Sequence, residues 1–217
     1  MTAVAATTLG GIAADRGAHT PDAADAAASR ATSFELARSR HSDGVLTRSL
    51  DDELGAVSTA VAATRAQIGF DPEQAAAVAA AYADPAERAD FEARARDAVA
   101  VRRAQAGVGL TETPPPPASY AATPLAYRVD PLGQLGTDAY AVHVLSWITL
   151  TSVTAEIKDH FYVGTQLLRW NGDDAWRLTI PAPTLRRDLA RQQPPVATPG
   201  TPAFTRAGWV LVEGANL

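Results

Sequence analysis

The chain has 217 residues, a formal net charge of −5 and no cysteine. The absence of cysteine excludes disulfides, thiolate catalysis and cysteine-ligated zinc. Nucleic-acid-binding domains usually carry a basic stripe, whereas the arginines here are interleaved with acids, so the sequence predicts no nucleic-acid partner.

The first 45 residues are rich in alanine, threonine, serine and aspartate, which predicts a disordered or partly helical tail. Met1–Ala14 is weakly apolar but lacks the basic start of a signal peptide. It is compatible with a disordered start, or with the end of a membrane segment that begins upstream. No stretch reaches the roughly 20 apolar residues of a spanning helix. Membrane contact is therefore expected only through an anchor outside this chain, and an extracytoplasmic envelope location is one possibility.

Three helices are expected before residue 110. An apolar stripe at helical spacing predicts the first, over about Leu50 to Ile68. Asp71-Pro72 and Asp84-Pro85 each place a capping acid before a proline at the first helical position. They predict helices over 72–83 and 85–105, the second ending near Gly107.

The proline run Pro114–Pro117 interrupts the helical pattern, and we interpret it as a stiff spacer rather than a ligand for proline-binding domains. Alternating apolar residues then predict strands over 122–129, 138–151, 160–170 and 175–180. Asn171-Gly172 lies between the last two strands and is typical of a tight hairpin. An antiparallel meander of about four strands is the expected result.

The fold class predicted from this order is α+β, with N-terminal helices packed on an antiparallel sheet. The expected divisions are a tail over 1–45, an α+β domain over 46–185 and a proline-rich C-terminal tail over 186–217. Within the last segment, 186–191 is predicted to form a short polar helix. Residues 207–212 form either a docked strand or a free apolar end.

The motifs of common catalytic sites are missing from the sequence. It contains no phosphate-binding loop with a lysine, no nucleophile elbow and no pair of histidines at metal-ligand spacing. We therefore predict no cofactor and no metal. His143 is the one weak candidate for a catalytic residue, because Asp159 or Glu156 on the neighbouring strand could supply a carboxylate partner. The alternative is a hydrogen-bonded histidine with a structural role.

The predicted sheet is rich in aromatic residues. Such residues pack in a core, but where they are exposed they anchor protein interfaces. The candidates for interface residues are Tyr140, Trp147, Tyr162, Trp170 and Trp176.

The run from Leu167 to Leu178, with Trp170-Asn171-Gly172 followed by Trp176-Arg177-Leu178, resembles the closing hairpin of NTF2-like (cystatin-like cone) domains. Leu125–Val129 and Trp147–Thr151 are similar to the strands that precede it. Residues 45 to about 185 also resemble actinobacterial proteins found beside conjugation-like or type IV secretion-like gene sets. The resemblance implies helices on a strongly curved sheet, and an accessory role in an envelope apparatus.

Three functions follow as hypotheses. The first is a non-enzymatic protein–protein interaction or assembly domain that binds protein partners or a second copy. The second is a small-molecule binder or enzyme of the ketosteroid-isomerase type, which needs an acid/base group such as His143 inside the cone. The third is a structural protein of a phage or mobile element.

Overall fold

The computed structural model describes residues 40–42, 45–48, 52–133, 138–172 and 175–212. The helices are α2 (Glu53–Arg65), α3 (Pro72–Tyr82), the 3-10 turn η2 (Pro85–Glu87), α4 (Arg88–Ala106), α5 (Pro183–Gln192) and α6 (Pro202–Arg206). The strands are β1 (Arg40–Ser42), β2 (Val45–Arg48), β3 (Ser119–Pro131), β4 (Ala139–Thr151), β5 (Ile157–Trp170), β6 (Trp176–Thr179) and β7 (Val210–Leu211). The chain is an α+β protein, as predicted from the order of its elements.

The N-terminal helices begin at the capping residues that the sequence indicates. The Asp71 carboxylate accepts hydrogen bonds from the backbone N–H groups of Glu73 and Gln74, and Asp84 accepts one from Ala86. Gly107 ends α4 in the left-handed conformation, with a φ of 73°, where glycine carries no steric penalty. The predicted helix over 85–105 differs in its first turn, which is a 3-10 turn.

The main sheet has the strand order β6-β5-β4-β3-β7 and is antiparallel throughout. The predicted four-strand meander is therefore confirmed, and β7 adds a fifth strand at the edge of β3. The predicted hairpin at Asn171-Gly172 is present, because β5 and β6 pair antiparallel and Trp170 lies opposite Trp176.

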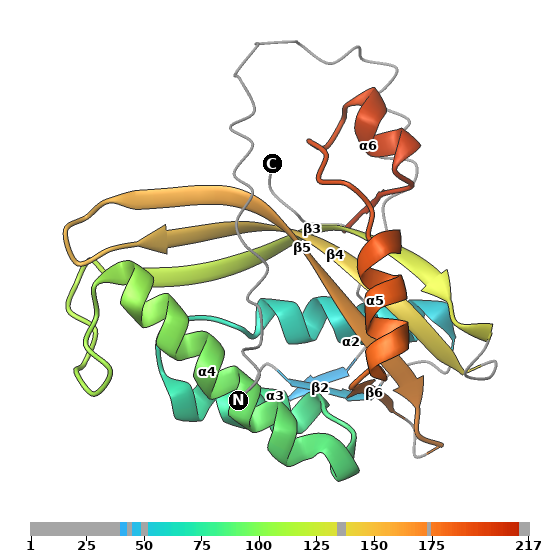
Figure 1. Ribbon diagram of the computed structural model, residues 1–217, viewed down its shortest axis with the longest axis horizontal. Helices are drawn as coiled ribbons and strands as arrows, with labels where there is room; N and C mark the ends of the chain where they lie inside the picture. The colour runs from blue at the N-terminus through green and yellow to red at the C-terminus, as the bar shows by residue number, and fades with distance from the viewer. Residues whose placement is uncertain (1–39, 43–44, 49–51, 134–137, 173–174, 213–217) are drawn as a thin grey trace.

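The helices α2, α3 and α4 lie below the sheet in Figure 1. We call this side of the sheet the helix face. Ala56, Val57, Ala60 and Val61 of α2 are buried there against a central cluster of sheet residues. That cluster contains Tyr127, Val142, Val144, Leu168 and Trp176.

The opposite side, here called the second face, is covered by the C-terminal segment, which packs above and in front of the sheet in Figure 1. Leu189 of α5 is buried against Ala141 and Leu167, while Phe204 and Trp209 are buried against Ala126, Leu145 and Val163. Residues 183–212 are therefore part of the folded body and do not form the predicted tail. Of the two alternatives for 207–212, the structure has the docked strand, because Val210 and Leu211 pair with β3.

The three long strands extend beyond this C-terminal cover. We call residues 119–124, 146–151 and 157–162 the outer half of the sheet, and the remaining residues of β3, β4, β5 and β6 the inner half. The outer half is the end of the sheet at the left of Figure 1. Its helix face packs on Phe70, Ala106 and Val108 through Leu150.

Among the described residues, no helix is both long and apolar enough to cross a bilayer. The weakly apolar segment Met1–Ala14 and most of the predicted tail lie outside the described residues. The curvature expected of an NTF2-like cone stays a prediction.

Candidate functional site

His143 lies at the middle of β4 on the second face, where its side chain is fully buried. Its Nδ1 is 2.8 Å from the Thr165 hydroxyl and its Nε2 is 3.0 Å from the Asp130 carboxylate. Asp130 also accepts bonds from Arg128, through Nε at 3.1 Å and Nη2 at 2.9 Å. The four side chains form one polar chain from β5 across β4 to β3.

The hydrogen-bond partners define the protonation of this ring. A carboxylate only accepts, so Nε2 carries the proton and Nδ1 accepts from the Thr165 hydroxyl. Burial lowers the pKa of His143 below its ordinary value, against the opposing pull of the Asp130 carboxylate. The neutral ring is thus held between a donor and an acceptor. This arrangement suits a satisfied structural network better than an acid/base group that meets a substrate.

The carboxylate beside His143 is Asp130 on β3, where the sequence analysis expected Asp159 or Glu156. Strand register explains the difference. In β5 the residue opposite His143 is Thr165, whereas Asp159 pairs with Thr149 far along the strand. Arg128 on β3 is opposite His143, and Asp130 lies two residues further on the same face.

A pocket of about 310 Å³ lies on the helix side of the molecule, between α3 and α4, the end of α2, and strands β5 and β6. Five alanines line it, namely Ala63, Ala75, Ala79, Ala95 and Ala98. Methyl side chains are too short to fill the space between two helices and a sheet, so an alanine-rich contact leaves room. Because β6 is short, the pocket also reaches around the open edge of β5 at Thr165 and Gln166.

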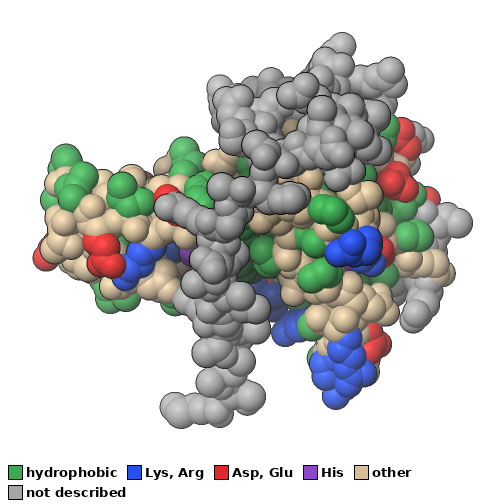
Figure 2. Space-filling model, turned by 90° about the horizontal axis from the view of Figure 1, so that it is seen from above, with side chains coloured by type: hydrophobic (Ala, Val, Ile, Leu, Met, Phe, Trp, Pro, Cys, Tyr) green, Lys and Arg blue, Asp and Glu red, His purple; other side chains and the backbone are tan. Residues whose placement is uncertain are grey.

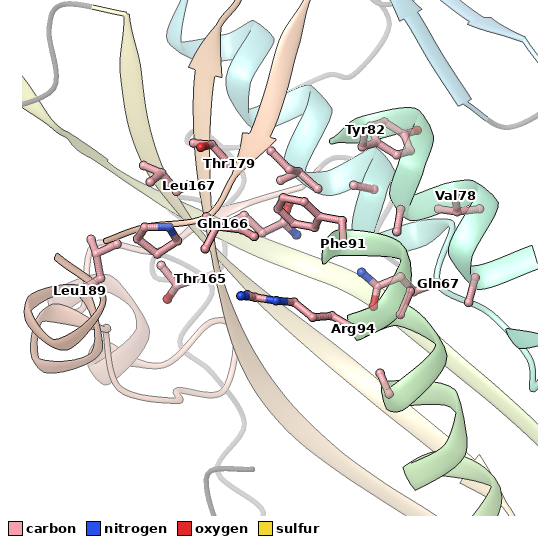
Figure 3. Close-up of a pocket in the computed structure, with 18 of the residues that line it drawn as sticks. Gln67, Val78, Tyr82, Phe91, Arg94, Thr165, Gln166, Leu167, Thr179 and Leu189 are labelled. Carbon is pink, nitrogen blue, oxygen red and sulfur yellow. The ribbon is translucent and has the colours of Figure 1, made fainter. Parts of the chain in front are cut away.

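The polar groups of this pocket are neutral or basic. Arg94 and Arg102 line it together with Gln67 and Gln166, and no aspartate or glutamate does. Figure 3 shows Arg94 extending from α4 toward the strand that carries Gln166, with Phe91 nearby. His143 does not line the pocket. The ketosteroid-isomerase hypothesis therefore lacks the acid/base residue that it named.

The second face of the outer half forms a different candidate surface. Its side chains come from alternate positions of the three strands, and we call them the outer sheet patch: Ser119, Ala121, Thr123, Trp147, Thr149, Thr151, Ile157, Asp159 and Phe161. Trp147 and Phe161 pair edge to face, with ring centroids 4.8 Å apart. Ile157 is 62% exposed. Figure 2 shows hydrophobic side chains on this end of the molecule, viewed from above.

The five aromatic residues predicted as interface anchors separate into two groups. Trp176 is buried in the core, and Tyr140 and Trp170 pack against it with ring centroids 5.3 and 5.5 Å away. Trp147 and Tyr162 lie in the outer half, on the second face and the helix face respectively. Tyr162 is 54% exposed and Trp147 is half-buried, whereas Trp176 is in the core, so Tyr162 and Trp147 are the candidates available to a partner.

No group of three or more metal-ligating side chains is present in the described part of the chain. Comparisons with models of protein families, with curated proteins and with solved structures find no match to this chain. The candidate sites therefore depend on the geometry alone.

The sequence analysis did not find the pocket, Asp130 or Phe161. Alanines at helical spacing were visible, but only the packing of α3 and α4 against β5 turns them into a cavity. Phe161 is the cross-strand neighbour of Trp147, and their pairing depends on the register of β4 and β5. The alternation of β5 carried that signal, because it placed Phe161 on the same face as Val163 and Leu167.

Proposed function

We propose that the chain is a non-enzymatic assembly domain that binds a second copy of itself through the outer sheet patch. The single observation behind this proposal is a sheet surface that extends past the C-terminal cover and holds a half-buried aromatic pair, whose Phe161 lies at the edge of the cover, and an exposed isoleucine. Elsewhere on the second face, α5 and α6 shield comparable residues from water.

The composition of the patch supports a protein partner. Its only charged side chain is Asp159, and the remainder are small, hydroxylated or aromatic apart from the aliphatic Ile157. The surface of α4, in contrast, is crowded with charges, from Arg88 and Asp90 to Asp97. Two sheets pack face to face when their contacting side chains are uncharged and interdigitate. The patch has this character, and a two-fold axis would bring it against its own copy.

The size of the patch limits the strength of the contact. Three strands spaced about 4.8 Å apart, each with three residues on one face, cover only a few hundred Å². Interfaces that bury less than about 1,200 Å² in total are usually weak or transient. We therefore expect association at high micromolar concentration, and tighter assembly only where other contacts add to this one.

Sedimentation equilibrium tests the proposal. The wild-type chain should form a dimer at high micromolar concentration, and Trp147→Ser and Ile157→Ser should each weaken dimerisation by about tenfold or more. Ile68→Ser is a matched control, because it removes the same side chain from a position outside the patch that is 50% exposed. A monomeric wild type, or a dimer that survives Trp147→Ser, would overturn the proposal.

A place in a conjugation-like or secretion-like envelope apparatus is a further part of the proposal, and it rests on the sequence resemblance alone. The physical contribution of this domain would be weak lateral contact between copies that are held close together. Such contacts gain effect from high local concentration.

A further inference from the structure

We infer that the pocket between α3, α4 and β5 binds a small organic anion, a carboxylate with an apolar body. The pocket shares no residue with the outer sheet patch, so this inference is independent of the proposed assembly. Its volume of about 310 Å³ is at the lower end of the range for ligand pockets.

The charge of the pocket selects an anion. Its two arginines have no acidic neighbour in the lining. Among the described residues, Arg94 has no ion-pair partner, although the nearby Arg96 binds Glu73 at 3.0 Å and lies close to Glu92. A guanidinium directed over an apolar cavity, without a carboxylate from the protein, is suited to a carboxylate from a ligand.

The second arginine is held in place by the protein. The Arg102 guanidinium lies 4.2 Å from the centre of the Tyr120 ring, and its Nη2 donates a long bond of 3.4 Å to Gln67. Its Nη1 is buried without a hydrogen-bond partner among the described residues. Burying such a donor carries a desolvation penalty.

Gln166 supplies the complementary group. Its Nε2 donates to the Thr64 hydroxyl at 2.7 Å, which fixes the amide orientation, and its Oε1 is buried and unpaired within the described structure. An orphaned donor and an orphaned acceptor thus belong to two residues of one pocket.

The apolar part of the ligand has its own contacts. Val78, Tyr82, Phe91 and Leu178 line the pocket beside the alanines. Transfer of an aliphatic or aromatic body into this space would remove its apolar surface from water. A neutral molecule would be stabilised by this burial of apolar surface alone, whereas a carboxylate would also form charge-assisted hydrogen bonds with arginine.

The experiment titrates the full chain with octanoate and benzoate, and with the neutral 1-octanol and benzyl alcohol, by heteronuclear NMR. The carboxylates should give saturable shifts at pocket residues. Arg94→Gln should weaken their binding by about tenfold or more, because it removes the charge-assisted hydrogen bonds between the guanidinium and the carboxylate. Arg88→Gln is the matched control, since it removes the same charge from an exposed position of α4 outside the pocket.

A second pair of variants tests the location without a change of charge. Ala98→Leu fills the pocket and should abolish binding, whereas Ala93→Leu makes the same change at an exposed position of the same helix. The inference is overturned if the carboxylates give no saturable shifts. It is also overturned if the neutral alcohols bind equally well, or if Ala98→Leu leaves the affinity unchanged.

Discussion

The inner and outer halves of the sheet are made from the same three long strands, but they differ in what covers them. The inner half is buried on both faces, by α2 on one side and the C-terminal segment on the other. The outer half packs on its helix face against Phe70, Ala106 and Val108, and on its second face only Phe161, next to the inner half, packs against the cluster of C-terminal residues among the described side chains. In this fold the reach of the C-terminal segment, and not the strands themselves, decides which part of the second face is core.

The polar residues follow the same division. In the inner half, His143 is under the cover and is bonded on both ring nitrogens. In the outer half the polar side chains of the second face are serine, threonine and Asp159, which lie beyond the cover. A polar group under the cover must find its hydrogen-bond partners within the protein, whereas a polar group in the outer half can bond to water.

The largest expected effect comes from removal of an anchor of the cover. Phe204 of α6 is 1% exposed and packs on Leu145 and Val163. Phe204→Ala should lower the free energy of unfolding by about 3–5 kcal/mol, because it removes a large buried side chain and leaves a cavity. Urea denaturation measures this change.

Val196→Ala is the control for this substitution, because Val196 belongs to the same segment and is 53% exposed. It should change the free energy of unfolding by no more than about 0.5 kcal/mol. If Phe204→Ala has an effect this small, the C-terminal segment contributes little to the core, and the contrast between the two halves fails.

Much of the fold could be predicted from local sequence. The capping signals at Asp71 and Asp84 define their helices without reference to the rest of the chain. Alternation along β4 separates Val142 and Val144 from His143 and Leu145 correctly. These features are local, and nearest neighbours in the chain are enough to establish them.

The cover itself could not be predicted in this way. Residues 183–212 carry many prolines and few large apolar residues, and Phe204 and Trp209 follow no helical or strand period. Their burial is a long-range property, since it depends on a sheet face that needs covering. The identity of the carboxylate beside His143 and the alanine-lined pocket were missed for the same reason, because both require the register or packing of distant segments.

A smaller effect is expected from the pH dependence of the inner half. The folded state lowers the pKa of His143, chiefly through burial, so the unfolded chain binds a proton more readily. As the pH falls below about 6.5, the free energy of unfolding should fall by up to about 1.4 kcal/mol per pH unit, until the pH reaches the pKa of the folded state. Urea denaturation at several values between pH 7.5 and 5 measures this slope.

His143→Gln should reduce this slope whatever its effect on stability at neutral pH. His160→Gln, on the helix face of β5, is the control and should leave the contribution of His143 in place. Equal slopes in the wild type and His143→Gln would show that the buried network does not resist protonation. The inner half would then admit water or protons more readily than the burial of His143 indicates.

The smallest effect on stability is expected in the outer half, at a position where the effect on association should be large. Ile157 is 62% exposed, so Ile157→Ser should change the free energy of unfolding of the monomer by no more than about 0.5 kcal/mol. Natural monomers carry such exposed side chains singly without consequence, but here Ile157 shares a face with Trp147 and Phe161.

Urea denaturation at low micromolar concentration, where the dimer is dissociated, isolates the stability of the monomer. A loss of several kcal/mol under those conditions would mean that Ile157 is needed for folding, and weaker dimerisation of the variant would then say nothing about the patch. An unchanged free energy of unfolding together with weakened dimerisation would assign the outer half of the sheet to contact between copies, and the inner half to folding.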